Sequence, residues 1–117
     1  MPYMLLIVEP VGQREARGLA GGSAVYQRML DFNETLRADG VLMATSSLAT
    51  AATRLHKPQG GRAAQVTDGP FAEAKEMIGG FFLLNCQTRE QALAWAERCP
   101  AAEWATVEVR ETGPCYT

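Results

Sequence analysis

The stretch TDGPFAEAKE, residues 67–76, places a rigid turn directly before a short group of charged side chains. Gly69 can adopt a positive φ at no steric cost, while Pro70 fixes its own φ and keeps Gly69 out of the helical region. The turn therefore restricts the backbone around Asp68. It also separates a predicted β-hairpin from the apolar run GGFFLL, residues 79–84, and marks where the hairpin is inserted into the fold.

The hairpin is predicted on the N-terminal side of this turn. Its strands are residues 53–56 and 62–67, and the intervening KPQGG, residues 57–61, supplies the proline and paired glycines of a tight connection. On the C-terminal side, the glycine pair at 79–80 is expected to introduce a strand at 81–84 whose large side chains point to both faces.

The N-terminal third predicts a strand followed by a helix. Residues 3–8 form a continuous apolar run, which indicates a strand buried on both faces. Residues 13–22 are polar and contain three glycines, so a loop or a frayed helical turn is expected there, with Ser23 as the helix N-cap. Apolar residues then recur at spacings of four and three, which predicts an amphipathic helix over 23–39 that ends at Gly40.

Three further elements complete the predicted order. Residues 41–44 are expected to form a second buried strand, and the Ser/Thr/Ala-rich residues 45–53 a loop. TREQ at 88–91 has the spacing of a capping box and begins a second helix that Pro100 ends. Residues 105–110 alternate between apolar and polar side chains, as in a half-buried strand.

This order predicts a single domain, residues 1–117, of the α+β class: a ferredoxin-like βαββαβ fold with an inserted β-hairpin. Both helices should cover one face of the sheet. Because residues 3–8 and 81–84 are apolar on both faces, the other face would be too apolar for contact with water. We therefore expect two copies to pack sheet to sheet as a homodimer.

Composition limits the function classes. The 47% of apolar and 21% of charged residues are ordinary for a globular domain. The three cysteines have no C-x-x-C spacing and indicate reduced thiols in a cytoplasmic protein. Eleven basic and thirteen acidic residues, without a Lys/Arg run, argue against nucleic acid as a partner. The apolar start is too short for a signal peptide core or a membrane span, so no membrane association is expected.

Residues 68–76, followed by 79–82, closely resemble the signature of the YCII-related family in its DGPF branch, as do residues 1–7, 36–42 and 95–102. The resemblance implies a dimeric α/β barrel and small bacterial proteins of mostly unassigned activity, often encoded near or fused to extracytoplasmic-function sigma factors. It also implies an acid–base pair of an aspartate and a first-helix histidine in the YCII branch. Asp68 matches the aspartate, whereas the predicted first helix contains no histidine.

Asp68 is the candidate catalytic residue, as a general base or hydrogen-bond acceptor in a pocket between sheet and hairpin. The alternative is a structural role, since an aspartate before glycine commonly bonds backbone N–H groups of its own turn. Lys75 is the expected anion contact. The candidate ligand-binding residues together are Tyr3, Phe71, Glu73, Lys75 and Glu76.

No cofactor or metal is expected. The glycine pairs lack dinucleotide-binding and Walker spacings, and the three carboxylates of residues 68–76 match no EF-hand loop. The lone histidine, His56, falls in the predicted hairpin and is expected to be exposed. Two hypotheses follow: a cofactor-free acid–base enzyme or binding protein for a small organic molecule, or a regulatory module that presents residues 68–76 to a sigma-factor-linked protein.

Overall fold

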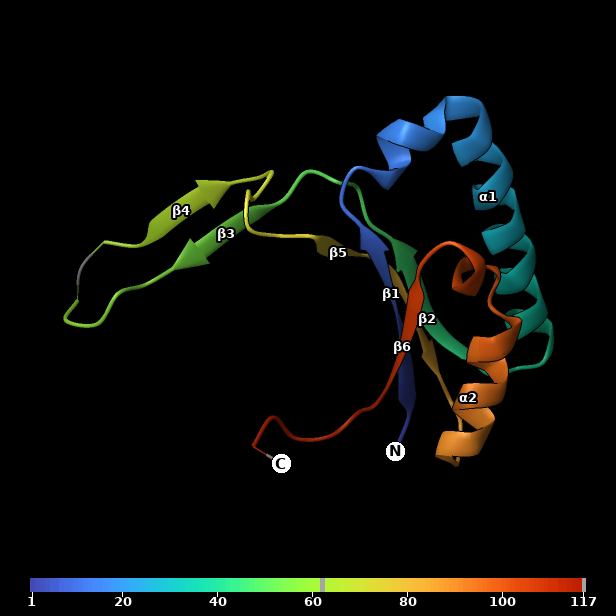
Figure 1. Cartoon of the computed structure of the whole chain (residues 1–117). Coiled ribbons are helices and arrows are strands. Elements are labelled where there is room, and N and C mark those ends of the chain that lie inside the picture. Colours follow the sequence, from blue (N-terminus) through green and yellow to red (C-terminus); the bar gives the residue numbers. More distant parts are fainter. Residues whose placement is uncertain (62, 117) are drawn as a thin grey trace.

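The structure, a computed structural model, describes residues 1–61 and 63–116. Figure 1 shows the elements in chain order. They are β1 (Tyr3–Pro10), α1 (Gln13–Ala38), β2 (Leu42–Ser47), β3 (Thr53–His56), β4 (Gln65–Asp68), β5 (Glu76–Leu84), α2 (Arg89–Arg98), the short 3-10 helix η1 (Pro100–Glu103) and β6 (Thr106–Glu111).

The main sheet has four strands in the order β2-β5-β1-β6, and all neighbouring strands are antiparallel. Both helices lie on the same side of this sheet (Figure 1). β3 and β4 form a separate two-stranded sheet. The predicted α+β class, the ferredoxin-like strand order and the inserted hairpin are therefore confirmed. The capping box of α2 is confirmed as well, because Thr88 accepts a hydrogen bond from the Gln91 backbone N–H and the Gln91 side chain bonds back.

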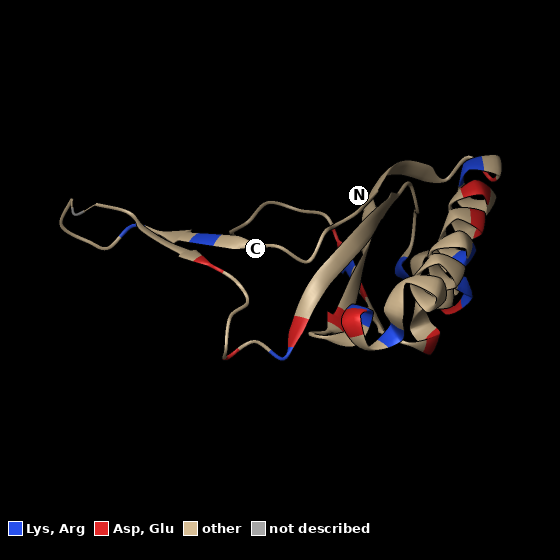
Figure 2. Ribbon diagram, turned by 90° about the horizontal axis from the view of Figure 1, so that it is seen from above, with Lys and Arg blue, Asp and Glu red and all other residues tan. Residues whose placement is uncertain are grey.

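The core lies between the sheet and the helices. Along β1 the residues facing the helices are buried and alternate with half-buried ones, as the two-residue period of a strand requires. Leu5, Leu36 and Leu84 are fully buried, and the Phe32 ring packs edge-on against Phe82 with ring centroids 5.3 Å apart. The prediction that β1 is buried on both faces is not met within one chain, because no element of the described chain covers the other face of the sheet (Figure 2).

Residues 13–22 are helical apart from a non-helical kink at Gly18, so of the two expectations for this segment the loop is wrong, and the predicted cap at Ser23 is wrong as well. The first helix begins at Gln13, after Gly12 in the left-handed conformation with φ 90°, and Gly12 O accepts a bond from the Ala16 N–H. Gly18, with φ 79° and ψ 173°, interrupts the helix without ending it. Ser23 lies in the middle of α1.

Tertiary bonds explain this early start of α1. Gln13 Nε2 donates to Trp104 O at 2.6 Å, and Arg14 forms an ion pair with Glu9. Both contacts join residues of the first helical turn to other elements. The three glycines lower the intrinsic helix propensity of this segment, but tertiary contacts can override propensity, and the local sequence does not reveal them.

Three strands are longer than predicted, and the first of them, β1, continues past Val8 to Pro10. β2 continues through Thr45 to Ser47, where a loop was expected, because these residues pair with β5. β5 begins at Glu76, so Gly79 and Gly80 lie inside a strand and not in a turn. A Cβ at Gly80 would lie 2.9 Å from Ser46 O, so glycine allows the backbones of β2 and β5 to approach. The predicted start of the second hairpin strand at Arg62 lies outside the described residues.

The hairpin arm, which we define as β3 and β4, projects away from the main sheet and the helices (Figures 1 and 2). All residues of both strands are exposed. The radius of gyration is 16.4 Å, whereas a compact domain of this length has about 13 Å. The arm is therefore an ordered part of the domain that lies outside its hydrophobic core.

The burial of two thiols gives a first prediction. Cys86 and Cys99 are buried and Cys115 is exposed. Burial raises the pKa of both the Cys86 and the Cys99 thiol, which lowers their thiolate fraction at neutral pH. We expect iodoacetamide at pH 7.5 to modify Cys115 at least about tenfold faster than the other two, as followed by mass spectrometry of the native protein. Cys115→Ser should remove the fast phase, and fast labelling of a buried thiol would contradict the assigned core.

Candidate functional site

A cavity of about 1080 Å³ lies between α1 and the helix-facing side of β1, β2 and β5. It exists because β2 places the small polar side chains of Thr45 and Ser47 on this face, next to Phe82 and Gly80 of β5. The facing stripe of α1 therefore meets no bulky partners at this edge of the sheet. The apolar wall of the cavity includes Ile7, Val25, Met29, Leu30, Phe82 and Trp104.

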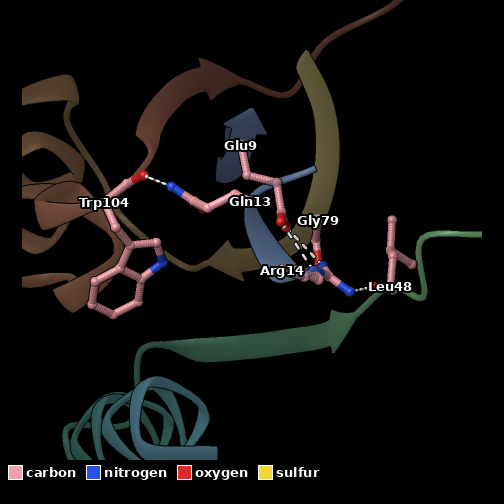
Figure 3. A network of polar contacts seen from close by, with 6 residues as sticks. All are labelled: Glu9, Gln13, Arg14, Leu48, Gly79 and Trp104. Carbon is pink, nitrogen blue, oxygen red and sulfur yellow. Dashed lines mark hydrogen bonds and ion pairs between the residues drawn. The ribbon is translucent and has the colours of Figure 1, made fainter. Parts of the chain in front are cut away.

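The polar end of the cavity is an ion pair between Glu9 and Arg14 (Figure 3). Glu9, the penultimate residue of β1, is only 6% exposed and is the buried charged residue of the described chain. Arg14 Nη2 lies 2.7 Å from Glu9 Oε1, and Arg14 Nε lies 3.0 Å from Glu9 Oε2. This bidentate geometry matches the planar guanidinium to the planar carboxylate and fixes the orientation of both groups.

Arg14 also connects separate parts of the backbone. Its Nη1 donates to Leu48 O at 2.7 Å and its Nη2 donates to Gly79 O at 3.3 Å. Hydrogen bonds to Glu9 raise the pKa of the Arg14 guanidinium, so Arg14 remains a cation. These bonds use four of the five N–H groups of the guanidinium, and within the described chain no acceptor takes the fifth.

Gly79 makes room for the ion pair. The pairing between β1 and β5 shifts between Ile7 and Val8, so Gly79 lies at a β-bulge without a partner in register. Its carbonyl accepts the Leu48 N–H at 2.9 Å in addition to the bond from Arg14. A Cβ at this position would collide with the Glu9 carboxylate and with the end of Arg14. A glycine is therefore required at position 79 for the Glu9 carboxylate to lie at the polar end of the cavity.

Asn33 adds a further polar group to the cavity wall, on the side of α1. Its Oδ1 is buried and has no hydrogen-bond partner among the described residues. Buried acceptors are rarely left unpaired, because a lost hydrogen bond costs about 1–3 kcal/mol. Asn33 Oδ1 is therefore a candidate acceptor for a hydrogen-bond donor of a bound molecule. Gln13 Oε1 is likewise buried and unpartnered, but Gln13 does not line the cavity.

The structure places Asp68 outside the lining of this cavity, at the end of β4. Its exposed side chain accepts a 2.7 Å hydrogen bond from Thr53 Oγ1, and the following Gly69 N–H donates to Ala52 O at 2.8 Å. The Gly69–Pro70 peptide bond is cis. The Thr53–Asp68 and Gly69–Ala52 hydrogen bonds join the two sides of the hairpin arm at its base. A catalytic role of Asp68 stays a prediction, and the expected pocket between sheet and hairpin is not the cavity described above.

Phe71 and Glu73 meet at the base of the arm through Arg54 of β3. The Arg54 guanidinium lies 3.7 Å from the centre of the Phe71 ring, and its Nη1 lies 2.6 Å from Glu73 Oε1. A backbone hydrogen bond and the Arg54 bond lower the pKa of the Glu73 carboxyl group. Sequence reasoning missed Arg54, because its contacts with residues 71–73 exist only once the hairpin has closed.

The remaining predicted residues are spread over the fold. Lys75 and Glu76 are exposed, and Lys75 O accepts the Val11 N–H at 3.0 Å where the chain enters β5. Tyr3 is buried in the core, opposite Glu111 of β6 and at the other end of β1 from Glu9. Burial and the Glu111 carboxylate raise the pKa of the Tyr3 phenol. His56 ends β3 and is exposed, as expected.

The described part of the chain offers neither a cluster of metal ligands nor a membrane-spanning helix. Among residues 1–61 and 63–116, no cluster of three or more His, Cys, Asp or Glu side chains is arranged to hold a metal ion. No helix in that part is long and apolar enough to cross a membrane.

The sequence contains a partial signal for the Glu9 site. Glu9 continues the odd-numbered face of β1 that Tyr3, Leu5 and Ile7 bury, so strand periodicity places its carboxylate on the core side. A charge in that position requires a partner. The sequence does not identify that partner, because the glycines of residues 13–22 predict a loop or a frayed helical turn there.

Gly79→Ala tests the need for space beside Glu9. We expect the added methyl to displace the carboxylate and to lower the free energy of unfolding by about 2–4 kcal/mol, as for a disrupted buried pair. The measurement is urea denaturation. Gly113→Ala is the matched control, since a Cβ there meets nothing within 4 Å.

A double-mutant cycle separates this mechanism from a general strand defect. If Gly79 acts through Glu9, the cost of Gly79→Ala should shrink by at least about 1 kcal/mol in a Glu9→Ala background. Strictly additive costs would show that the glycine is needed for another reason.

Comparison with known proteins agrees with this fold. The model of the YCII-related domain matches residues 1–114. An uncharacterized protein of Rhizobium meliloti (strain 1021) is 52% identical over 31 residues, a match that covers 26% of this chain and about a quarter (25%) of that protein. The solved structure of 5-chloro-2-hydroxyhydroquinone dehydrochlorinase (TftG) from Burkholderia phenoliruptrix AC1100, in complex with 2,5-dihydroxybenzoquinone, is similar with a TM-score of 0.56 and 15% identity over 97% of this chain and 94% of its own. Since the family model spans nearly the whole sequence, the chain belongs to the YCII-related family.

Proposed function

We propose that this protein binds a small organic molecule in the cavity between α1 and the sheet, and that it acts there as a cofactor-free acid–base enzyme or as a binding protein. The observation that carries the proposal is the buried Glu9 carboxylate at one end of a largely apolar cavity. A few polar groups converging in an apolar pocket are typical of small-molecule sites.

The lining favours a ring-containing molecule with oxygen substituents. Phe82, Met29 and Trp104 offer flat or flexible apolar surface, while Glu9 accepts a hydrogen bond from a hydroxyl group. The fifth N–H of Arg14 can donate to a neighbouring oxygen of the same molecule. The dehydrochlorinase gives support at the level of the fold, since that protein was solved with 2,5-dihydroxybenzoquinone, a small oxygenated ring.

In the enzymatic form of the proposal, Glu9 accepts a proton from the bound molecule. Arg14 then has two roles, because it holds the carboxylate in one orientation and its charge stabilises the anion that deprotonation leaves behind. The apolar wall lowers the local dielectric constant and so strengthens both interactions. The alternative form of the proposal assigns the acid–base role to Asp68, at the base of the hairpin arm.

Substitution of the two carboxylates distinguishes these forms. Using a panel of phenols, hydroxybenzoates and quinones as probes, we expect binding in the cavity, seen as NMR shift changes at α1 residues. Glu9→Gln should raise the dissociation constant of the bound probe by about tenfold or more. Asp68→Asn and the exposed control Glu97→Gln should leave that constant unchanged. The loss of a charged hydrogen-bond acceptor is the physical reason.

A second variant keeps the cavity proposal testable if Glu9→Gln fails to fold. Leu30→Trp fills the cavity from its partly exposed side, where Leu30 is 38% exposed, and should abolish binding at unchanged melting temperature. Loss of binding in Asp68→Asn alone, with a native melting temperature, would move the site to the arm. Failure of every probe to shift α1 would contradict the cavity proposal.

For the assembly, we propose a homodimer. The side chains of Met4, Leu6 and Val8 lie half-buried on the sheet face that no helix covers, together with the half-buried Leu83 and the exposed Ile78 of β5. A face with this much apolar surface favours packing on a second sheet. In an isologous dimer the same sheet face of both copies is buried in one contact, so no other kind of partner is needed to cover it.

A regulatory or partner-binding module is the second candidate function, favoured by the exposure of residues 68–76. Asp68, Glu73, Lys75 and Glu76 all lie on the surface beside the hairpin arm. The resemblance of this segment to the DGPF branch points to a sigma-factor-linked protein as the partner.

Charge reversal tests this second candidate. We expect Glu73→Lys with Glu76→Lys to abolish capture of a specific partner from the native cell, because two attractive charges become repulsive. Glu97→Lys on α2 is the control. An unchanged set of captured proteins would count against the module.

A further inference from the structure

We infer that the hairpin arm is an interaction surface for a second copy of this chain, and that each subunit clasps the other through Leu55 and Val66. This inference goes beyond the proposed ligand site and does not depend on any ligand. It also goes beyond sheet packing, because it assigns part of the subunit contact to an element that lies outside the sheet.

The arm carries an uncovered apolar pair. Leu55 and Val66 are direct cross-strand partners, and they are 63% and 60% exposed. Side chains in register on two antiparallel strands point to the same face, so the pair forms one apolar spot. An isolated two-stranded hairpin is marginally stable in water. The arm therefore needs a surface against which this spot can pack.

The base of the arm is already held in place. Arg54 bonds Glu73 and lies over the Phe71 ring, while Thr53 bonds Asp68. These contacts fix the direction in which the arm leaves the domain. A preorganised element loses less conformational entropy when it docks, which favours association.

The direction of the arm selects the sheet face beside it. In both Figure 1 and Figure 2 the helices lie on one side of the sheet and the arm extends toward the other side. A layer that packs on the uncovered face must therefore lie alongside the arm. Sheets pack about 10 Å apart, and the eight residues from Thr53 to Gly60 can extend over roughly 25 Å. The arm is thus long enough to reach across a partner's sheet.

Charge distribution favours a second copy as the occupant. The strand β6 places Glu108 and Arg110 on the uncovered face, in register with Leu6 and Met4. Two copies related by a two-fold axis can pair Glu108 of one with Arg110 of the other, on both sides of the axis. The same face supplies apolar residues for the partner's Leu55–Val66 spot. One symmetric contact therefore covers both uncovered surfaces of the chain.

Analytical ultracentrifugation of the full chain tests the clasp. We expect a wild-type dimer and a dissociation constant at least about tenfold higher for Leu55→Ser with Val66→Ser, because two apolar side chains no longer leave water on association. Leu19→Ser is the matched control, since Leu19 is 89% exposed on α1 and should leave the dimer unchanged. Circular dichroism verifies that each variant retains its fold.

Cross-linking locates the contact independently of affinity. A photoreactive benzoylphenylalanine in place of His56, in dimers mixed from ¹⁴N- and ¹⁵N-labelled subunits, should yield mixed-isotope products with peptides of β1, β5 or β6. A monomeric wild type, a dimer insensitive to the arm variant, or cross-links only within one subunit would each overturn the inference. An arm-insensitive dimer would leave sheet packing intact, and ligand binding in the cavity is unaffected by any of these outcomes.

Discussion

The ion pair of Glu9 and Arg14 is the interaction on which the arrangement of this domain depends. It joins the end of β1 to the first turn of α1, and the remaining bonds of Arg14 add β5 and the segment after β2. A carboxylate that is 6% exposed would be very costly without its cation. The pair therefore fixes where α1 begins, next to the end of β1. The space that remains between α1 and the sheet is the cavity.

The cavity and the ion pair have a common origin in small residues. Gly79 leaves room for the Glu9 carboxylate, and Gly80 lets the β2 backbone approach β5. Thr45 and Ser47 then leave the adjacent part of α1 without large side chains to pack against. The hollow of about 1080 Å³ opens to the surface past Leu19, Tyr26 and Leu30 and ends in the charged pair. This combination of apolar wall and few polar groups is typical of small-molecule sites.

The opposite side of the sheet presents a different constraint. The half-buried aliphatic face and the exposed hairpin arm are both uncovered in the described chain. Their orientation relative to each other is fixed by the bonded base of the arm, where Arg54 contacts both Phe71 and Glu73. The two faces of one sheet thus differ, since one borders the cavity together with the helices and the other is uncovered in the described chain.

The sequence by itself determined the class of the fold, the order of the main strands, the hairpin and the capped helix α2, because periodicity and turn chemistry are local properties. It also placed Asp68 at a restricted turn and identified the family signature around it. It did not determine the extent of α1, the strand character of residues 45–47 and 76–80, or the partner of Glu9. Those features depend on contacts between segments far apart in the chain: Arg14 with Gly79, Gln13 with Trp104, and β2 with β5. Only the tertiary structure decides them, because local propensity at glycine-rich or Ser/Thr-rich segments is weak and long-range bonds override it.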